Sequence, residues 1–133
     1  MEAKNLLSGK RGLVMGVAND KSIAWGIAKA AANQGAKIAF SFQMEGFGKR
    51  LAPLADSIGS NIMIECDVAE EGAVNRCFYK LATHWPAIDF GVHALAFSDK
   101  NELKGAYMDT SRDNFANTMM VSAYSFTEVA RSA

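Results

Sequence analysis

The strongest chemical signal in the sequence is a turn that joins an apolar segment to a helical pattern. Residues 12–16 are mostly apolar and precede a loop that runs to Ser22, where the helical pattern begins. The first amides of a helix lack backbone acceptors and its dipole favours negative charge, so this junction can bind a phosphate. Gly16 allows a close backbone approach, and the Ser22 hydroxyl can either cap the helix or face a phosphate. An ordinary strand–turn–helix connection is the competing interpretation.

The spacing departs from the G-x-G-x-x-G motif of dinucleotide-binding proteins. A longer loop ending in Ser22 replaces the middle glycine, and the next glycine along the helix is Gly26. The last glycine of that motif serves close packing between helix and strand. We therefore expect Gly26 to let the first helix lie close to a sheet.

Strand-like and helix-like patterns alternate along the whole chain. The predicted strands are 11–16, 36–42, 61–66 and 90–97. The predicted helices are 22–34, 46–58, 70–84 and 111–133, and a polar loop is expected at 98–110. Near-continuous apolar strands separated by helices predict an α/β fold, a Rossmann-type, doubly wound parallel sheet in three α/β/α layers.

Four such strands in the order 3-2-1-4 leave the fourth strand as an open edge. Dinucleotide-binding sheets are usually completed to six strands by a second half. We therefore expect residues 1–133 to be the N-terminal portion of a single Rossmann domain, with four strands of a larger sheet. Pro53 argues against an unbroken second helix, and the third helix is expected to present one apolar face formed by Phe78, Leu81, Ala82 and Trp85.

Ligands of doubly wound sheets bind beyond the carboxyl ends of the strands. The residues at those ends are Gly16, Ser22 and Ile23, then Phe42 and Gln43, then Asp67 and Val68, and finally Leu95, Ala96 and Ser98. Gln43 is either a ribose hydrogen-bond partner or a solvated loop residue. Asp67 either caps the third helix or accepts from an adenine amino group while Val68 packs on the ring.

Composition excludes several classes of partner. Fourteen basic and fourteen acidic side chains cancel, so no electrostatic argument favours nucleic acid or a membrane surface. No apolar run approaches the roughly 18 residues of a membrane span, and residues 1–5 lack a secretory signal pattern, so the expected location is the cytoplasm. Cys66 and Cys77, with His84 and His93, do not have metal-site spacing; buried thiols and no metal are expected.

Several segments together resemble the bacterial NADH-dependent enoyl-acyl-carrier-protein reductases, a divergent branch of the short-chain dehydrogenase/reductase superfamily. The resemblance runs through residues 16–28, 42–43, 66–68, 92–97, 98–105 and 124–126. It implies hydride transfer from NADH to a trans-2-enoyl thioester on acyl carrier protein in fatty-acid biosynthesis. It also implies dinucleotide contacts from Gly16, Ser22, Ile23, Gln43, Asp67, Val68 and Leu95, with Ser98 bordering the substrate.

The same resemblance suggests a homotetramer built partly on the fourth helix, for which Phe115, Met119, Met120 and Phe126 are suited. Neutral Gln43 beside Glu45 favours NADH, whereas Lys49 and Arg50 nearby leave the coenzyme preference open.

Two departures from the family pattern stand out. Ala96 replaces the usual glycine after the fourth strand and is expected either to crowd the nicotinamide ribose or to be accommodated. The family's catalytic tyrosine and lysine belong to its second half, so we expect no catalytic residue in this chain and no turnover by it alone. Tyr124 and Arg131 share the tyrosine–lysine spacing, but arginine cannot replace a compact ammonium.

Two other function classes stay open at this point. One is a non-catalytic dinucleotide-binding or interaction module. The other is a mononucleotide binder of flavodoxin type, which the loop from Gly16 to Ser22 fits poorly.

Overall fold

The computed structural model describes residues 5–133 and contains one sheet of four parallel strands. Residues 1–4 lie outside the described residues. The expectation that residues 1–5 carry no secretory signal therefore falls mostly on residues that the structure does not describe. The order β3-β2-β1-β4 confirms the order predicted from the sequence. The strands are β1 (Arg11–Met15), β2 (Lys37–Phe42), β3 (Met63–Glu65) and β4 (Phe90–His93).

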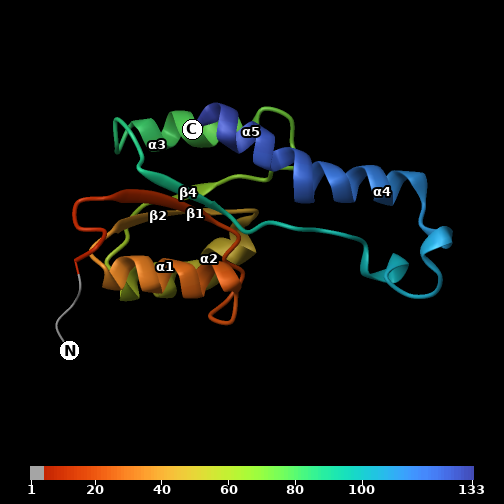
Figure 1. Ribbon diagram of the computed structural model, residues 1–133, viewed down its shortest axis with the longest axis horizontal. Coiled ribbons are helices and arrows are strands. Elements are labelled where there is room, and N and C mark those ends of the chain that lie inside the picture. The colour runs from red at the N-terminus through yellow and green to blue at the C-terminus, as the bar shows by residue number, and fades with distance from the viewer. Residues whose placement is uncertain (1–4) are drawn as a thin grey trace.

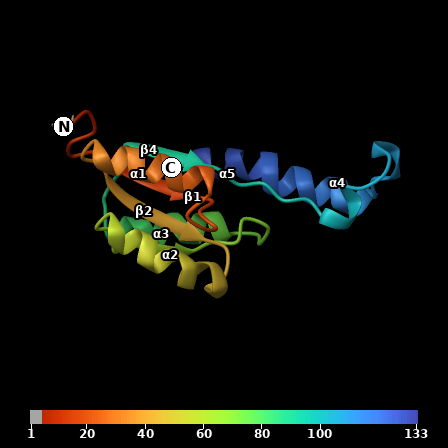
Figure 2. The same cartoon turned by 90° about the horizontal axis from the view of Figure 1, so that it is seen from below.

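Helices cover both faces of this sheet. One layer contains α1 (Ile23–Asn33) and α2 (Glu45–Ser57), and the opposite layer contains α3 (Ala73–Ala82) and α5 (Ser125–Ser132), as Figures 1 and 2 show. The arrangement confirms the predicted three-layer Rossmann architecture. It also places every strand's carboxyl end at one edge of the sheet.

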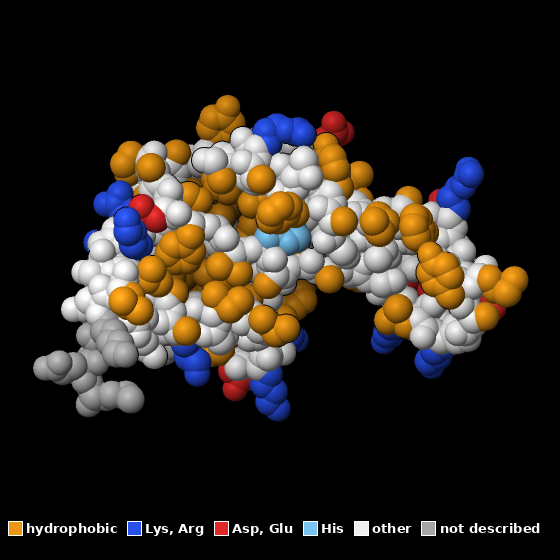
Figure 3. Space-filling model, in the orientation of Figure 1, with side chains coloured by type: hydrophobic (Ala, Val, Ile, Leu, Met, Phe, Trp, Pro, Cys, Tyr) orange, Lys and Arg blue, Asp and Glu red, His pale blue; other side chains and the backbone are white. Residues whose placement is uncertain are grey.

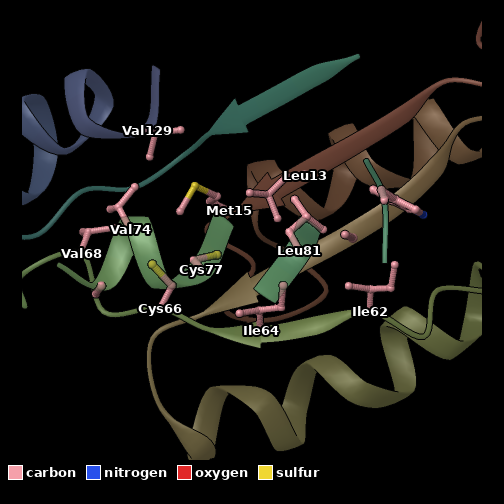
Figure 4. Packing of buried hydrophobic residues seen from close by; sticks show 13 residues of the cluster. Leu13, Met15, Ile62, Ile64, Cys66, Val68, Val74, Cys77, Leu81 and Val129 are labelled. Carbon is pink, nitrogen blue, oxygen red and sulfur yellow. The ribbon is translucent and has the colours of Figure 1, made fainter. Parts of the chain in front are cut away.

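The core is divided by the sheet into two clusters, because successive strand side chains point to opposite faces. On the α3/α5 side, Leu13 and Met15 of β1 pack with Ile64 of β3, Leu81 of α3 and Val129 of α5 (Figure 4). The other cluster joins four buried side chains of β1, β2, α1 and α2, namely Val14, Phe40, Trp25 and Leu51. Burial on both faces explains why β1 and β2, the two central strands, read as continuous apolar runs.

Several element bounds differ from those predicted. β3 has three residues rather than six, and α3 begins at Ala73 rather than near residue 70. Its buried face is formed by Ala73, Val74, Cys77 and Leu81, whereas Ala82 is exposed. Pro53 does not interrupt α2; it lies on the exposed side, where the carbonyl that loses its partner can face water.

The expectation for Gly26 is wrong. A Cβ added there would meet no atom within 4 Å, because this position faces away from the sheet. The glycine that close packing does require is Gly12, in β1, where an added Cβ would overlap the ring of Phe90 in the neighbouring strand β4. The close approach is therefore between two strands rather than between helix and sheet.

The C-terminal third of the chain forms an arm that extends away from the sheet and returns to it at α5 (Figure 1). It consists of two short 3-10 turns, η1 (Lys100–Glu102) and η2 (Tyr107–Asp109), and one long helix. That helix comprises α4 (Arg112–Met119), a π-helical turn η3 (Met120–Tyr124) and α5. The Ser111 hydroxyl caps it by accepting from the Asn114 amide at 3.1 Å, at the predicted start.

Hydrophobic side chains gather over the open edge of the sheet and continue along the arm (Figure 3). Phe115, Met119, Met120 and Phe126 are between 44% and 59% exposed. Within residues 5–133, no helix is both long enough and apolar enough to cross a bilayer.

The two glycines give a stability test of this packing. We expect Gly12→Ala to lower the free energy of unfolding by about 1–3 kcal/mol, since the added methyl group must displace the Phe90 ring. Gly26→Ala, the matched control, is expected to raise it by up to about 1 kcal/mol, since alanine has the higher helix propensity. Urea denaturation measures both, and equal effects of the two substitutions would contradict this account.

Candidate functional site

A cleft of about 380 Å³ lies at the carboxyl ends of the four strands. Residues that follow each strand line it, and five of the seven residues predicted to bind a dinucleotide are among them: Gly16, Gln43, Asp67, Val68 and Leu95. The structure thus brings together side chains that are up to 79 positions apart in the sequence. The predicted crevice at the strand ends is present.

Gly16 lies where β1 ends and its loop departs. Its φ is +111°, in the region that favours glycine, and an added Cβ would overlap the carbonyl oxygen of Ala94 after β4. A side chain at this position is therefore excluded by the protein's own backbone as well as by the needs of a ligand. Val17 is buried below the loop, and both Val17 and Ala18 line the cleft.

Ser22 stabilises the loop and does not cap the helix. Its Oγ accepts from the amides of Ala18 at 2.9 Å and Asn19 at 3.1 Å, and it makes no cap bond to α1. The predicted side-chain cap is therefore absent, and the predicted contact of this hydroxyl with a phosphate stays a prediction. Its role is to fix the backbone of the segment that lines the cleft.

The start of α1 keeps free hydrogen-bond donors. Among the described residues, no backbone acceptor pairs with the amides of Ile23 and Ala24. The Ile23 side chain itself is 80% exposed, and neither Ser22 nor Ile23 is among the residues lining the cleft. Any contact from Ile23 to an anion is therefore expected through its backbone amide.

Asp67 follows β3 and closes a turn. Its Oδ1 accepts from the Ala69 amide at 3.0 Å, and its carbonyl accepts from the Glu70 amide at 3.0 Å. The expectation that Asp67 caps the third helix is wrong, because the N-cap is Gly72, at a φ of +79°. The turn leaves Oδ2 of Asp67 without a hydrogen-bond partner among residues 5–133, so this oxygen can accept from a ligand.

The neighbours of Asp67 differ in exposure. Val68 is buried, contributing to the core cluster while it also lines the cleft. Gln43, after β2, is exposed. The floor of this end of the cleft is thus apolar, with polar groups at its margin, which suits a purine and its ribose.

The segment after β4 forms the opposite wall. Ala94 extends the strand pairing by one residue, since its amide donates to the Met15 carbonyl at 3.1 Å. Beyond it, half-buried Leu95 and exposed Ala96 line the cleft, followed by Phe97. Ala96 therefore lines the cleft, and both the crowding of a coenzyme by its methyl group and its accommodation stay predictions.

Ser98 is separated from the other predicted site residues. It lines a second hollow of about 340 Å³, between the arm's loop and α4. Its Oγ accepts from Asn114 Nδ2 and from Thr118 Oγ1, each at 3.1 Å. The described structure does not bring Ser98 into the cleft.

Sequence reasoning missed lining residues that come from helices. Phe47 of α2, Asn117 of α4 and Val121 of η3 all contribute to the cleft. The spacing of Asn117 and Val121, four residues apart on one helix face, is the signal that could have identified them. From the sequence, the fourth helix was considered only as part of an oligomer interface, so this pair was not assigned to the site.

The two cysteines are free and buried, as predicted. A hydrogen bond with the Cys77 thiol, together with burial, raises the pKa of the Cys66 thiol. Cys66 lines the cleft but stays protonated near neutral pH, and so is a poor nucleophile. Over the described part of the chain, no three side chains of His, Cys, Asp or Glu come together as a metal site would require.

Comparisons with known proteins agree with this geometry. A model of the family described as enoyl-(acyl carrier protein) reductase matches residues 16–133. The enoyl-[acyl-carrier-protein] reductase [NADH] 2 of Rhizobium meliloti is 55% identical over 128 residues, which are 96% of this chain and 48% of the relative. A Rickettsia typhi enzyme of the same description is 45% identical and covered over 49% of its length.

Solved structures give the same result. The crystal structure of FabI from Candidatus Liberibacter asiaticus has a TM-score of 0.95 and 56% identity, covering 97% of this chain and 50% of that one. The reductase of Anaplasma phagocytophilum, solved in complex with NAD, has a TM-score of 0.93 and 53% identity, covering 96% of this chain and 49% of that one. The chain spans about half the length of these relatives. On this evidence the chain belongs to the enoyl-(acyl carrier protein) reductase family.

Proposed function

We propose that this chain supplies the coenzyme-binding part of an NADH-dependent enoyl-[acyl-carrier-protein] reductase, which reduces trans-2-enoyl thioesters carried by acyl carrier protein. The observation that carries the proposal is the single cleft into which all four strand ends bring predicted dinucleotide contacts. The relatives bear the name of this NADH enzyme, and one neighbouring structure was solved with NAD. Fatty-acid synthesis and a cytoplasmic location follow from the same proposal.

The cleft fits the parts of a dinucleotide in order. The side-chain-free backbone at Gly16 and the unpaired amides at the start of α1 suit the diphosphate. The apolar surface of Val68 and the free Oδ2 of Asp67 suit adenine and its amino group. When bound, the coenzyme supplies a hydride, while this chain's residues bind and orient it.

The nicotinamide half is assigned to the remaining wall. Strands β2 and β3 lie on one side of β1, and β4 lies on the other. With adenosine beside Gln43 and Asp67, the rest of the molecule must cross the end of β1 toward Leu95 and Ala96.

Neutral Gln43 favours NADH over NADPH, and the two cations near it make only exposed contacts. Lys49 pairs with Glu45 at 3.6 Å, and the Arg50 guanidinium lies over the Phe47 ring at 5.7 Å. Neither is held in place for a 2′-phosphate, and neutral Gln43 at the cleft offers no charge to one.

Reduction of the enoyl thioester requires an acid and a ribose-binding cation that we do not assign to these residues. Tyr124 is 45% exposed and does not line the cleft, and Arg131 lies on the following helix. No residue of this chain is therefore given a catalytic role. We keep Ser98 as a residue at the border of the substrate. This assignment requires the bound substrate to extend from the cleft toward the second hollow, which Ser98 lines.

We further propose that the arm binds a second copy of the chain, giving a homo-oligomer of the tetrameric type that the family resemblance suggests. The large side chains Phe115, Met119, Met120 and Phe126 form an exposed apolar surface along it. Surfaces of this kind mark protein interfaces.

Binding of NADH is the first test. We expect one NADH to bind per chain, and Asp67→Ala to weaken binding about 5- to 10-fold, since it removes the free Oδ2 acceptor together with the Oδ1 bond to the Ala69 amide. Asp56→Ala, on the exposed side of α2, is the matched control and should leave the affinity unchanged. Isothermal calorimetry measures all three; absence of binding by the unmodified chain would sink the proposal.

Coenzyme preference is the second test. The unmodified chain is expected to bind NADH more tightly than NADPH, and Gln43→Arg to shift the ratio of the two affinities about tenfold toward NADPH, or about 1.4 kcal/mol. Asn33→Arg makes the same charge change at the far end of α1 and should not alter the ratio. The same shift in both variants would mean that net charge, rather than a ribose contact, sets the preference.

Turnover is the third test. The 133-residue chain is expected to bind NADH without oxidising it when a crotonyl thioester is added, because it holds no assigned proton donor. Absorbance at the NADH band follows the reaction, with heat-inactivated chain as the control. Oxidation above that control would place a catalytic group within these residues.

A further inference from the structure

The segment that follows β4 is hydrogen-bonded to side chains of the long helix. The Ser122 Oγ accepts from the Phe97 amide at 3.0 Å and donates to the Phe97 carbonyl at 3.3 Å. One hydroxyl thus satisfies both backbone groups of one residue, as a neighbouring strand would do. Further along, the Asp99 amide donates to Asn114 Oδ1 at 3.0 Å.

The start of the same segment is fixed by the π-helical turn. There the Ser125 amide donates to the carbonyl of Met120, five residues back. The Val121 carbonyl instead accepts from Ser125 Oγ at 2.6 Å. Since that bond uses the hydroxyl proton, Ser125 Oγ accepts from His93 Nε2 at 2.7 Å, which assigns the proton to Nε2.

The two anchors enclose the wall of the cleft. Ser125 holds His93 and Ser122 holds Phe97, and the residues between them, Ala94, Leu95 and Ala96, all line the cleft. Ala94 also pairs with β1, but over the described residues the backbones of Leu95 and Ala96 make no hydrogen bond. The Leu95 side chain packs against the core, but within residues 5–133 the backbone of this stretch is hydrogen-bonded only at its two ends, at Ala94 and at Phe97 through Ser122.

We infer that Ser122 is a positioning residue for the nicotinamide half of the coenzyme. It does not line the cleft, and it acts by fixing the Phe97 backbone so that Leu95 and Ala96 stand at the end of the cleft opposite Asp67. The inference rests on the proposed function, because it takes NADH as the ligand. Without the hydroxyl, the Phe97 amide and carbonyl lose their partner and the wall is free to shift.

The test compares NADH with ADP, which carries the adenosine and diphosphate but lacks the nicotinamide riboside. We expect Ser122→Ala to raise the dissociation constant of NADH at least fivefold and to leave that of ADP within twofold. Ser132→Ala removes a hydroxyl from the same helix, one that donates to Asn75 at 2.6 Å away from the cleft, and should change neither. Ser122→Thr keeps the hydroxyl and should restore NADH binding.

The two ligands separate positioning from general destabilisation. Equal weakening of NADH and ADP by Ser122→Ala, or no weakening of either, would overturn the inference while leaving the proposed function in place. If the unmodified chain bound neither ligand, the proposed function would fail first. Hydrogen exchange on the free chain tests the restraint without any ligand: the Phe97 amide should exchange faster in Ser122→Ala than in Ser132→Ala, and equal rates would count against it.

Discussion

The contact on which the site depends is the approach of Gly16 to the carbonyl of Ala94. At this point β1 and β4 have just ended, and their continuations separate. A Cβ on Gly16 would occupy the position of the Ala94 oxygen, so any other residue would force the two segments apart. The loop toward Ser22 would then leave the sheet in another direction, and the amides at the start of α1 would no longer face the strand ends.

How far the sequence predicts this structure depends on the range of the interactions involved. Strand order, layers and the crevice follow from patterns within each element and from the handedness of βαβ connections. Buried and free cysteines also follow, because their apolar neighbours are local. The interpretation of Gly26 was wrong, and the role of Gly12 was not predicted. Gly12 of β1 meets Phe90, 78 positions away, and no local pattern records that contact.

The polar residues before helices show a second reason why some predictions from the sequence were wrong. A serine or aspartate before a helical pattern favours a cap, but the same oxygen can accept from loop amides at equal cost. Ser22 bonds Ala18 and Asn19, and Asp67 bonds Ala69, so both stabilise turns. The helix α3 then begins at Ala73, with Gly72 as its N-cap. Five of the seven predicted dinucleotide contacts still lie in the cleft, because β-strand ends, unlike caps, are fixed by the sheet.

The long helix connects the wall of the cleft to the exposed apolar surface of the arm. Its last part packs in the core through Val129, and Ser122 in its π-helical turn holds the wall of the cleft. Its first part carries Phe115 and Met119 of the exposed apolar surface, which continues to Met120 and Phe126. A π turn suits this position because it redirects side chains without ending the helix. Since these three parts form one continuous helix, a partner on the arm and a coenzyme in the cleft would both contact it, the coenzyme through Asn117 and Val121.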